Sequence, residues 1–254
     1  MTKLVVITGG NTGIGRGLAL AFASQAYSVA VSYKADAQAT ASLVAEIEAK
    51  GGRALGLPCD AGRSAEVSAF YDEIERWHGG APDVVVNNAG LQTWSSLLDL
   101  AEEDWDRVIQ TNLKGTFLNT QAAARRMIAT EKGGSIVNIG SGCNKLAFPR
   151  LVDYTASKGG IEQLTKVSAT ELGPYGIRVN CVAPGAILNE RTLQEAPDYA
   201  ASWGRITPLR RAGTVDDITG PVLFFASEAA AFVTGQTLWV DGGVFTQANW
   251  PQDV

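Results

Sequence analysis

Short apolar runs rich in valine and isoleucine recur along the chain, and longer stretches with helical periodicity separate them. A run that is apolar at nearly every position is typical of a strand buried on both faces, as in a parallel sheet. The pattern predicts seven strands, at residues 4–8, 29–33, 53–57, 84–87, 135–139, 178–182 and 237–240. It predicts helices at residues 14–24, 37–50, 64–77, 103–126, 154–172 and 215–226.

The alternation of strands and helices predicts the fold class. Strand–helix–strand units of this kind are right-handed and build a doubly wound α/β sheet with helices on both faces. The chain shows no internal repeat, low-complexity tract or linker, so we expect a single domain over residues 1–254. Residues 186–211 carry Pro197, Pro208 and mixed charge without a periodic pattern. A connection that long is more often a binding lid than a spacer, and we name it the lid segment.

Composition and charge exclude several classes of function. The chain has 254 residues, 46% of them hydrophobic and 19% charged, which is enough apolar material for a sizeable core. A net charge of −5 gives no reason to expect nucleic-acid binding, and no basic run suggests an anionic membrane. No apolar stretch reaches the roughly 20 residues of a membrane span. The N-terminus runs directly into a predicted strand without a signal peptide, so we expect a cytoplasmic protein.

The three cysteines and the single histidine limit the possible chemistry further. Cys59, Cys143 and Cys181 are odd in number and widely spaced, which fits neither a disulfide framework nor a zinc site. A Ser-His-Asp triad would have to use His78, which stands next to two glycines in a loop-like stretch. The chemistry is therefore expected elsewhere, without a metal.

A glycine-rich turn follows the first predicted strand and opens the first helix, with the sequence Thr8-Gly9-Gly10-Asn11-Thr12-Gly13-Ile14-Gly15. Glycines allow a sharp turn and a close approach to a pyrophosphate, and the helix N-terminus offers free N–H groups. The spacing differs from the commoner Gly-x-Gly-x-x-Gly fingerprint, and no Gly-Lys-Ser/Thr follows as in a Walker A loop. The position predicts a dinucleotide site, and the alternative is a glycine turn without a ligand.

Tyr154 is the only tyrosine in the chain with a lysine, Lys158, four residues later. Residues four apart share a helix face, and alone such a pair is usually solvated. Oxidation of an alcohol requires a base for the hydroxyl proton, but the ordinary tyrosine pKa of about 10 is high for that task. A cation ~4 Å away is worth about 4 kcal/mol at an effective dielectric near 20, or up to about three pKa units. We therefore expect Lys158 to lower the pKa of Tyr154.

Several of these motifs fall at the carboxyl ends of predicted strands, where open α/β sheets bind ligands. With them in place, the chain resembles the short-chain dehydrogenase/reductase family over essentially its whole length. The resemblance is carried, in order, by Thr8–Gly15, Asn87-Asn88-Ala89-Gly90, Asn112, Ser141, Tyr154 with Lys158, and Pro184-Gly185. It implies a Rossmann-type sheet and an NAD(P)-dependent oxidoreductase that interconverts a secondary alcohol and a carbonyl.

The resemblance assigns catalytic roles to four residues, Asn112, Ser141, Tyr154 and Lys158. Tyr154 is the base, Lys158 tunes it and binds the nicotinamide ribose, and Ser141 donates to the substrate oxygen. Asn112 holds a water behind the lysine. The structural alternatives are an ordinary strand-end hydroxyl for Ser141 and a buried helix asparagine that bonds backbone for Asn112.

The cofactor contacts implied by the resemblance lie in the glycine turn, at the strand ends and on the catalytic helix. They are Gly9, Asn11, Thr12, Gly13, Ile14, Gly15, Tyr33, Lys34, Asp60, Ala61, Asn88, Ala89, Gly90, Tyr154, Lys158, Pro184, Gly185 and Ile187. Asp60 would contact adenine, and its alternative is a helix-start aspartate. Asn87 is expected to pack against the cofactor. Asn189 stands where the family often has threonine.

The choice between NAD and NADP depends on the end of the second strand, Ser32-Tyr33-Lys34. An acidic residue there would bind the ribose hydroxyls and select NAD. None is present, Asp36 belongs to the next helix, and Lys34 offers a partner for a 2′-phosphate. We expect NADP(H), with NAD(H) as an alternative.

Candidate substrate residues follow the strand ends and mix polar groups with aromatic rings, which suits a sugar or polyol. They are Gln92, Trp94, Ser141, Cys143, Asn144 and Arg150, with Phe148 and the lid residues Glu190 and Trp203. Cys143 is expected to pack rather than react, since no adjacent basic residue favours a thiolate.

Within the family, the run Asp153–Gly160 and the Ser32-Tyr33-Lys34 region look closest to glucose 1-dehydrogenase-like members, which implies a small-molecule substrate. A 3-oxoacyl-carrier-protein reductase is the first alternative, because Arg205, Arg210 and Arg211 lie in or beside the lid segment and would suit an acidic carrier. The alternative of another class is a regulatory protein that binds nucleotide without turnover, but the catalytic residues are intact. The family commonly pairs subunits through helices 103–126 and 154–172, so we expect a homotetramer.

Overall fold

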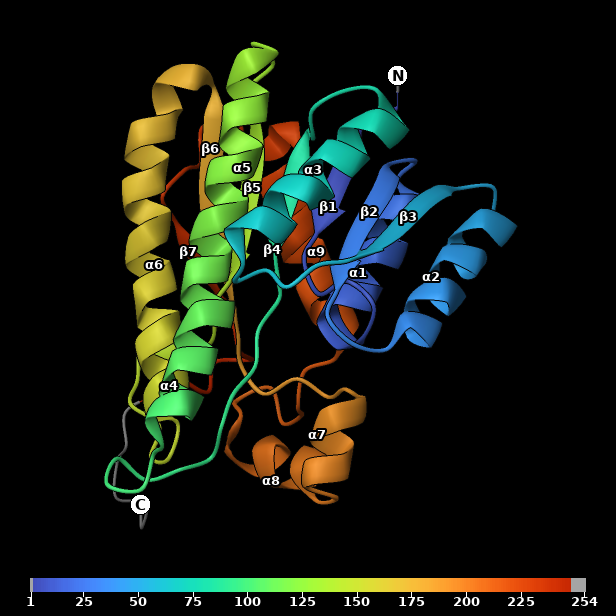
Figure 1. The fold of residues 1–254 in the computed structure, drawn as a ribbon. Helices are drawn as coiled ribbons and strands as arrows, with labels where there is room; N and C mark the ends of the chain where they lie inside the picture. The colour runs from blue at the N-terminus through green and yellow to red at the C-terminus, as the bar shows by residue number, and fades with distance from the viewer. Residues whose placement is uncertain (1, 248–254) are drawn as a thin grey trace.

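Seven parallel strands form one sheet in the order β3-β2-β1-β4-β5-β6-β7 in the computed structural model, which describes residues 2–247 (Figure 1). Their bounds are β1 Leu4–Ile7, β2 Ser28–Tyr33, β3 Arg53–Pro58, β4 Val84–Asn87, β5 Gly134–Ile139, β6 Ile177–Pro184 and β7 Thr237–Val240. The predicted doubly wound, Rossmann-type α/β fold is confirmed, and all seven predicted strands are present with small shifts at their ends.

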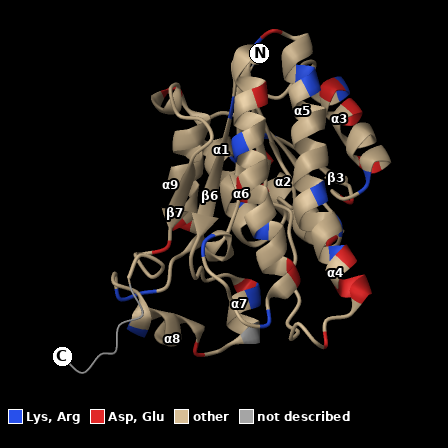
Figure 2. Ribbon diagram, turned by 90° about the vertical axis from the view of Figure 1, so that its left-hand side faces the viewer, with Lys and Arg blue, Asp and Glu red and all other residues tan. Residues whose placement is uncertain are grey.

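Helices cover both faces of the sheet (Figure 1). One face packs against α1 (Gly13–Ser24), α2 (Ala37–Ala49) and α9 (Val215–Ala226). The other packs against α3 (Ser64–His78), α5 (Gly115–Ala129) and α6 (Val152–Leu172). α4 (Glu102–Val108) leads into α5, and its first turn carries three acidic residues (Figure 2). The lid segment carries α7 (Glu190–Glu195) and α8 (Tyr199–Ile206), below the carboxyl ends of the strands in Figure 1.

The apolar run of β1 shows why the sheet is buried on both sides. Val5 and Ile7 point into the core beneath α1, α2 and α9, whereas Leu4 and Val6 point into the core beneath α3 and α5. All four side chains are completely buried. Because successive strand residues face opposite sides, a strand between two helical layers has to be apolar at every position.

Three expectations from the sequence need correction. The predicted helix 103–126 is α4 and α5 joined by a π-helical turn, η1 (Ile109–Lys114), and it extends to Ala129. The lid segment is not irregular, because it contains α7 and α8. His78 does not lie in a loop: it is the last residue of α3, and its Nε2 lies 3.1 Å from the Thr2 carbonyl. With six and eight residues, α7 and α8 are too short for a helical periodicity to be detected in the sequence.

β1 and β4 lie side by side at the point where the strand order reverses. Open α/β sheets bind ligands outside the carboxyl ends of their strands at such a point. Within residues 2–247, no helix is long and apolar enough to cross a membrane, and no cluster of His, Cys, Asp or Glu side chains could hold a metal ion.

Candidate active site

The glycine turn between β1 and α1 leaves space that side chains would fill. Gly9 has a φ of +59°, and a Cβ there would lie 3.0 Å from the Ala89 Cα. A Cβ on Gly15 would lie 2.2 Å from the Gly9 carbonyl oxygen, which no backbone could tolerate. The turn is therefore a cradle that only glycine permits, and it fits the close approach of a dinucleotide pyrophosphate.

The loop after β4 holds this turn in place. Thr8 Oγ1 accepts hydrogen bonds from the backbone N–H groups of Asn88 and Ala89, both at 3.0 Å. Asn88 Nδ2 donates back to the carbonyls of Thr8 at 3.0 Å and Gly9 at 2.8 Å. The neighbouring Asn87 points elsewhere.

Asn87 is buried and does not line the cofactor cavity, contrary to the expectation from the sequence. Its Nδ2 donates to Asn138 Oδ1 at 2.8 Å and Thr120 Oγ1 at 3.0 Å. Asn138 in turn donates to Thr165 at 2.9 Å. Adjacent residues at a strand end face opposite sides, so only Asn88 reaches the turn.

A cavity of about 450 Å³ extends from the glycine turn to the ends of β2 and β3. Its lining includes the predicted residues Gly9, Asn11, Thr12, Ile14, Gly15, Tyr33, Lys34, Asp60, Ala61, Asn88, Ala89 and Gly90. Gly13 is not part of the lining, but its φ of +51° sets the start of α1. Asn11 Nδ2 donates to the carbonyls of Ala35 at 3.0 Å and Asp36 at 3.2 Å, and so joins the glycine turn to the tip of β2.

Lys34 forms an ion pair at the mouth of this cavity. Its Nζ lies 2.7 Å from Asp60 Oδ2, and its side chain is 60% exposed. Asp60 Oδ1 accepts from the Gly62 N–H at 3.0 Å. Desolvation acts to raise the pKa of Asp60, but the hydrogen bonds from Lys34 and Gly62 and the charges of Lys34 and Arg63 hold it below its ordinary value. Lys34 is therefore more than a solvated cation, and a 2′-phosphate would share it with Asp60.

Two other polar side chains near the tip of β2, those of Ser32 and Asp36, already form hydrogen bonds within the protein. Ser32 is buried, and its Oγ accepts from the Gly9 N–H at 3.2 Å. Asp36 is the N-cap of α2 and accepts from Ala39 N–H, as expected for a residue of the next helix. The helix-start alternative for Asp60 does not hold, since Arg63 is the N-cap of α3. Contact of Asp60 with adenine stays a prediction.

A second cavity, of about 290 Å³, lies between the ends of β4, β5 and β6 and the lid segment. Its lining brings together the predicted residues Gln92, Trp94, Ser141, Cys143, Phe148, Tyr154, Lys158, Pro184, Gly185, Ile187 and Trp203. It shares Ile14, Asn88, Gly90, Leu91, Asn189 and Arg191 with the nucleotide cavity, so the two are continuous. The residues predicted for chemistry and for cofactor binding therefore meet at one edge of the sheet.

Lys158 is buried in the first turns of α6, with 4% of its surface exposed. Its Nζ donates to the Ile139 carbonyl at 2.7 Å and lies 5.4 Å from the centroid of the Tyr154 ring. Burial disfavours the charged form and lowers the pKa of Lys158 to about 8. Part of the lysine population therefore loses its charge just above neutral pH.

Tyr154 has a raised pKa in this structure, of about 12, and the expectation of a lowered value is wrong here. Burial is the main cause, and negative charge at Cys143 adds to it. A hydrogen bond with Ser141 and the charge of Arg191 act in the opposite direction. The cost of removing a phenolate from water exceeds the attraction expected from Lys158, whose ammonium donates to the Ile139 carbonyl.

Ser141 is the N-cap of a short 3₁₀ helix, η2 (Gly142–Asn144), and it also lines the cavity. Its Oγ accepts from the Cys143 N–H at 3.2 Å, and its N–H donates to Asn144 Oδ1 at 3.0 Å. Asn144 is thereby turned into the cap and does not line the cavity. Arg150 is exposed, has a φ of +67° and also lies outside the lining.

Asn112 is completely buried within η1. Its Oδ1 accepts from the Leu91 N–H at 2.9 Å, and its Nδ2 donates to the Leu91 carbonyl at 2.9 Å and to Ser157 Oγ at 3.0 Å. The side chain ties the loop after β4 to α6, as the structural alternative expected. A relay role behind Lys158 stays a prediction.

The sequence interpretation missed several residues of the lining, among them Arg191, Tyr199 and Phe245. Arg191 and Tyr199 belong to the lid segment, where no periodic pattern in the sequence allows the direction of the side chains to be predicted. Phe245 follows β7 and packs edge-on against Phe148, with ring centroids 5.5 Å apart. Glu190, in contrast, does not line the cavity. Cys143 does, but burial raises the pKa of its thiol, which agrees with a packing role.

Comparisons with known proteins extend this description. Residues 9–245 match the family model described as enoyl-(acyl carrier protein) reductase. A 3-oxoacyl-(acyl-carrier-protein) reductase of Staphylococcus aureus is 38% identical over 245 residues, covering 96% of this chain and 99% of the relative. An L-rhamnose 1-dehydrogenase (NAD(P)(+)) of a Sphingomonas strain is 37% identical over 248 residues, 96% of each chain.

A solved structure shares the fold closely. It is a gluconate 5-dehydrogenase of Burkholderia cenocepacia in complex with NADP and tartrate, 36% identical, with a TM-score of 0.90. The match covers 97% of this chain and 96% of the other.

Proposed function

Because the chain belongs to the short-chain dehydrogenase/reductase family and acts on CH–OH groups with NAD(P), we propose that its substrate is a small sugar or polyol. The observation that carries the proposal is the meeting of Tyr154, Ser141 and Lys158 in one cavity that opens into the glycine cradle. We further propose that residues 1–254 form one catalytic domain whose lid segment, 186–211, covers the substrate.

Each catalytic side chain has a distinct task in this proposal. The nicotinamide cofactor, when bound, supplies or accepts the hydride. Tyr154 Oη takes the hydroxyl proton during oxidation and returns it during reduction. Ser141 donates a hydrogen bond to the substrate oxygen and stabilises charge that develops there. The Lys158 cation favours the phenolate form of Tyr154, against the burial that raises the tyrosine pKa.

The character of the second cavity supports a polyhydroxylated substrate. Gln92 offers hydrogen-bonding groups, and Trp94 and Trp203 offer flat apolar faces. Among similar proteins, one is named an L-rhamnose 1-dehydrogenase and one a gluconate 5-dehydrogenase. A volume of about 290 Å³ suits a small molecule better than a long acyl chain.

We propose NADP(H) as the preferred cofactor, with NAD(H) as an alternative. Lys34 stands at the mouth of the nucleotide cavity, and the acidic Asp36 is used as a helix cap. The gluconate 5-dehydrogenase structure holds NADP, and the L-rhamnose dehydrogenase is named for both cofactors. Because Lys34 forms an ion pair with Asp60, a bound 2′-phosphate would share the Lys34 ammonium with the Asp60 carboxylate.

A 3-oxoacyl-carrier-protein reductase is the second candidate, favoured by the staphylococcal relative. Of the three arginines that would meet an acidic carrier, Arg205 and Arg210 are exposed. Arg211 is held by Asp217, with contacts of 2.6 and 2.7 Å, and is less available. The surface is thus less basic than the sequence suggested.

A substrate screen separates these candidates. The purified protein is assayed with NADP+ and NAD+ on sugars, sugar acids and polyols, and with NADPH on an acetoacetyl thioester. We expect the highest kcat/KM on a polyhydroxylated substrate with NADP+. If kcat/KM for reduction of the thioester exceeds kcat/KM for oxidation of every polyhydroxylated substrate by about tenfold, the result favours the acyl reductase instead.

We also propose a homotetramer assembled through α5 and α6. Phe117 on α5 is 44% exposed and Val167 on α6 is 50% exposed, so both helices offer an apolar side chain to a partner subunit. Sedimentation of the protein at micromolar concentration tests this, and a monomer alone would contradict it.

A further inference from the structure

The charged residues in the lining of the substrate cavity are both basic. Among the described residues of the lining, the charged ones are Lys158 and Arg191, and no Asp or Glu is present. Polar neutral groups and aromatic rings form the rest. A cavity with two cations and no carboxylate attracts an anion and gives no such advantage to a neutral molecule.

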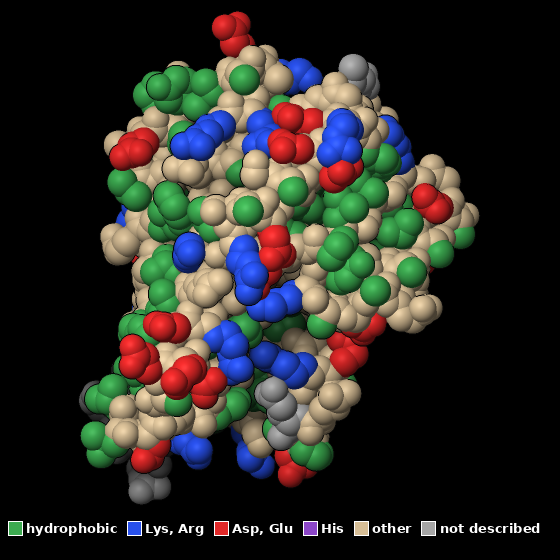
Figure 3. Space-filling model, viewed as in Figure 1, with side chains coloured by type: hydrophobic (Ala, Val, Ile, Leu, Met, Phe, Trp, Pro, Cys, Tyr) green, Lys and Arg blue, Asp and Glu red, His purple; other side chains and the backbone are tan. Residues whose placement is uncertain are grey.

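The two cations have different surroundings. Lys158 is buried behind Tyr154, and its ammonium donates to the Ile139 carbonyl. Arg191 is exposed, belongs to α7 and lines both the substrate cavity and the nucleotide cavity. Figure 3 shows Lys and Arg side chains gathered at the hollow between the body of the molecule and the segment that carries α7. Arg191 is therefore the cation that a ligand entering from solvent meets.

The backbone around Arg191 is held by a set of local hydrogen bonds. Asn189 Oδ1 accepts from the Thr192 N–H at 3.0 Å, and the Asn189 N–H donates to Thr192 Oγ1 at 2.9 Å. Ile187 belongs to the same lining, and its carbonyl lies 3.3 Å from Thr192 Oγ1. This reciprocal cap fixes the turn from which Arg191 projects.

Arg191 acts electrostatically across the cavity on Tyr154, since its charge lowers the tyrosine pKa against the larger effect of burial. An anion bound to Arg191 would therefore lie in the same cavity as the substrate oxygen that reacts at Tyr154. Arg191 also has an interaction within the protein. Its five N–H donors in a planar fork allow a carboxylate to bind in addition.

We propose that Arg191 determines substrate specificity by binding a carboxylate of the substrate, so that the enzyme acts on a polyhydroxy acid rather than a neutral sugar. This inference rests on the proposed function and narrows its substrate class. The carboxylate lies toward α7, and the hydroxyl or carbonyl that reacts lies toward Tyr154 and Ser141. A phosphate of the cofactor is the other possible anion, because Arg191 also borders the nucleotide cavity.

The test compares D-gluconate with D-sorbitol, which share six carbons and differ by a carboxylate in place of a hydroxymethyl group. kcat/KM is measured with NADP+ for the parent, Arg191→Met and Arg191→Lys. Arg76→Met is the control, because Arg76 is exposed on α3 and lines neither cavity. A titration of NADP+ by protein fluorescence gives the cofactor Kd of each variant.

We expect the parent to prefer gluconate by about tenfold or more, as one charge-assisted contact allows. Arg191→Met should lose this preference through a higher KM for gluconate, and Arg191→Lys should keep part of it. Because Arg191 also acts on Tyr154, kcat/KM for sorbitol should fall as well, but by a smaller factor than kcat/KM for gluconate. The NADP+ Kd and the Arg76→Met control should change less than about twofold.

Two results would overturn the inference. One is an equal effect of Arg191→Met on gluconate and sorbitol. The other is a weaker NADP+ Kd with an unchanged substrate preference, which would assign Arg191 to a cofactor phosphate. If neither compound is oxidised, the proposed function is decided by the substrate screen, and the role of Arg191 by calorimetric binding of gluconate to the NADP+-saturated protein. Binding that Arg191→Met abolishes supports the role of Arg191, and absent or unaffected binding contradicts it.

Discussion

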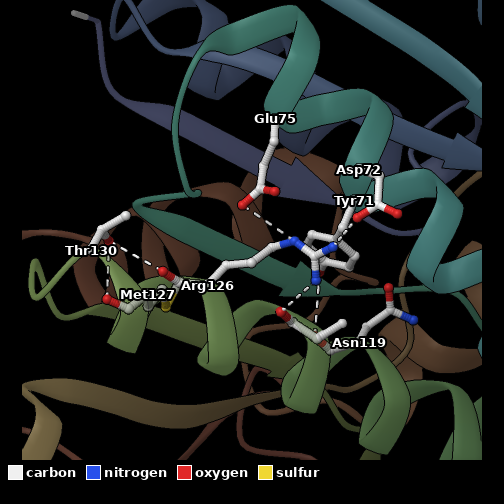
Figure 4. Close-up of polar contacts among 8 residues, drawn as sticks. Tyr71, Asp72, Glu75, Asn119, Arg126, Met127 and Thr130 are labelled. Carbon is white, nitrogen blue, oxygen red and sulfur yellow. Dashed lines mark hydrogen bonds and ion pairs between the residues drawn. The ribbon is translucent and has the colours of Figure 1, made fainter.

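Arg126 and Lys158 are two poorly exposed cations whose surroundings differ sharply. Arg126 on α5 forms ion pairs with Asp72 and Glu75 of α3, donates to the Ala122 carbonyl at 3.1 Å, and lies over the Tyr71 ring (Figure 4). Lys158 on α6 has one hydrogen bond, to the Ile139 carbonyl. Among the described residues, no carboxylate lies within ion-pair distance of Lys158.

The comparison separates a structural cation from a catalytic one. The carboxylates around Arg126 compensate its charge and join α3 to α5 on the face of the sheet far from the glycine turn. The charge of Lys158 is largely uncompensated, so burial lowers its pKa to about 8. An uncompensated buried charge is costly to stability, and such charges are typical of functional sites.

The largest expected effect follows from removing the uncompensated cation. Lys158→Met should lower kcat by about 10²- to 10⁴-fold, the usual contribution of assisted proton transfer. The free energy of unfolding at pH 7 should stay equal or rise, because a costly buried charge is removed. Steady-state kinetics and urea denaturation measure the two quantities. A variant that loses both activity and stability would indicate that Lys158 is structural.

The opposite result is expected for the compensated cation. Arg126→Met should lower the free energy of unfolding by about 2 kcal/mol, since it leaves two carboxylates without their partner. Asp72 and Glu75 are partly exposed, which keeps the loss below that of a fully buried pair. The activity per folded molecule should be unchanged. Arg126→Lys is the matched control and should recover part of the stability.

Lys34 is a third cation, exposed and paired with a single carboxylate, and it should give an intermediate effect. Lys34→Ala should weaken NADP(H) binding by about tenfold, the lower end of a charge-assisted contact, because Asp60 and solvent compete for the ammonium. Binding of NAD(H) should hardly change. Cofactor titrations with both dinucleotides measure this. If the parent prefers NAD(H) by about tenfold or more, the interpretation of the β2 tip is wrong.

The last expected effect is the part of the pH dependence of stability that Lys158 contributes, which comparison with Lys158→Met isolates. Its pKa is about 8 in the folded protein and about 10.4 in an unfolded chain, so the unfolded state binds more protons between these values. The contribution of Lys158 to stability therefore rises with pH from about 8 to about 10. The stability gap between Lys158→Met and the parent should narrow between pH 7 and pH 9.5. A gap that stays constant would show that the lysine is charged throughout.

Much of the fold could be predicted because its signals are local. The bounds of β4, β7 and α9 agree with the predicted ranges, because the apolar run or the helical periodicity stops abruptly at the ends of each of these elements. Tyr154 and Lys158 were found from a spacing within one helix. The glycine cradle was found from its position directly after a strand.

The missed features depend on residues that are distant in sequence. The ion pair between Lys34 and Asp60 joins two strand ends. The place of Arg191 in the lining depends on how the lid segment folds over the sheet. The raised pKa of Tyr154 depends on burial by several elements at once, which no pair of residues reveals.

Replacing Tyr154 by phenylalanine tests the central claim most directly. The variant removes the hydroxyl that accepts and returns the proton and keeps the ring that fills the cavity. We expect kcat to fall by about 10³-fold or more, while the Kd for NADP(H), measured by fluorescence titration, changes less than about twofold. Turnover within about tenfold of the parent would contradict the account and would remove Tyr154 as the base.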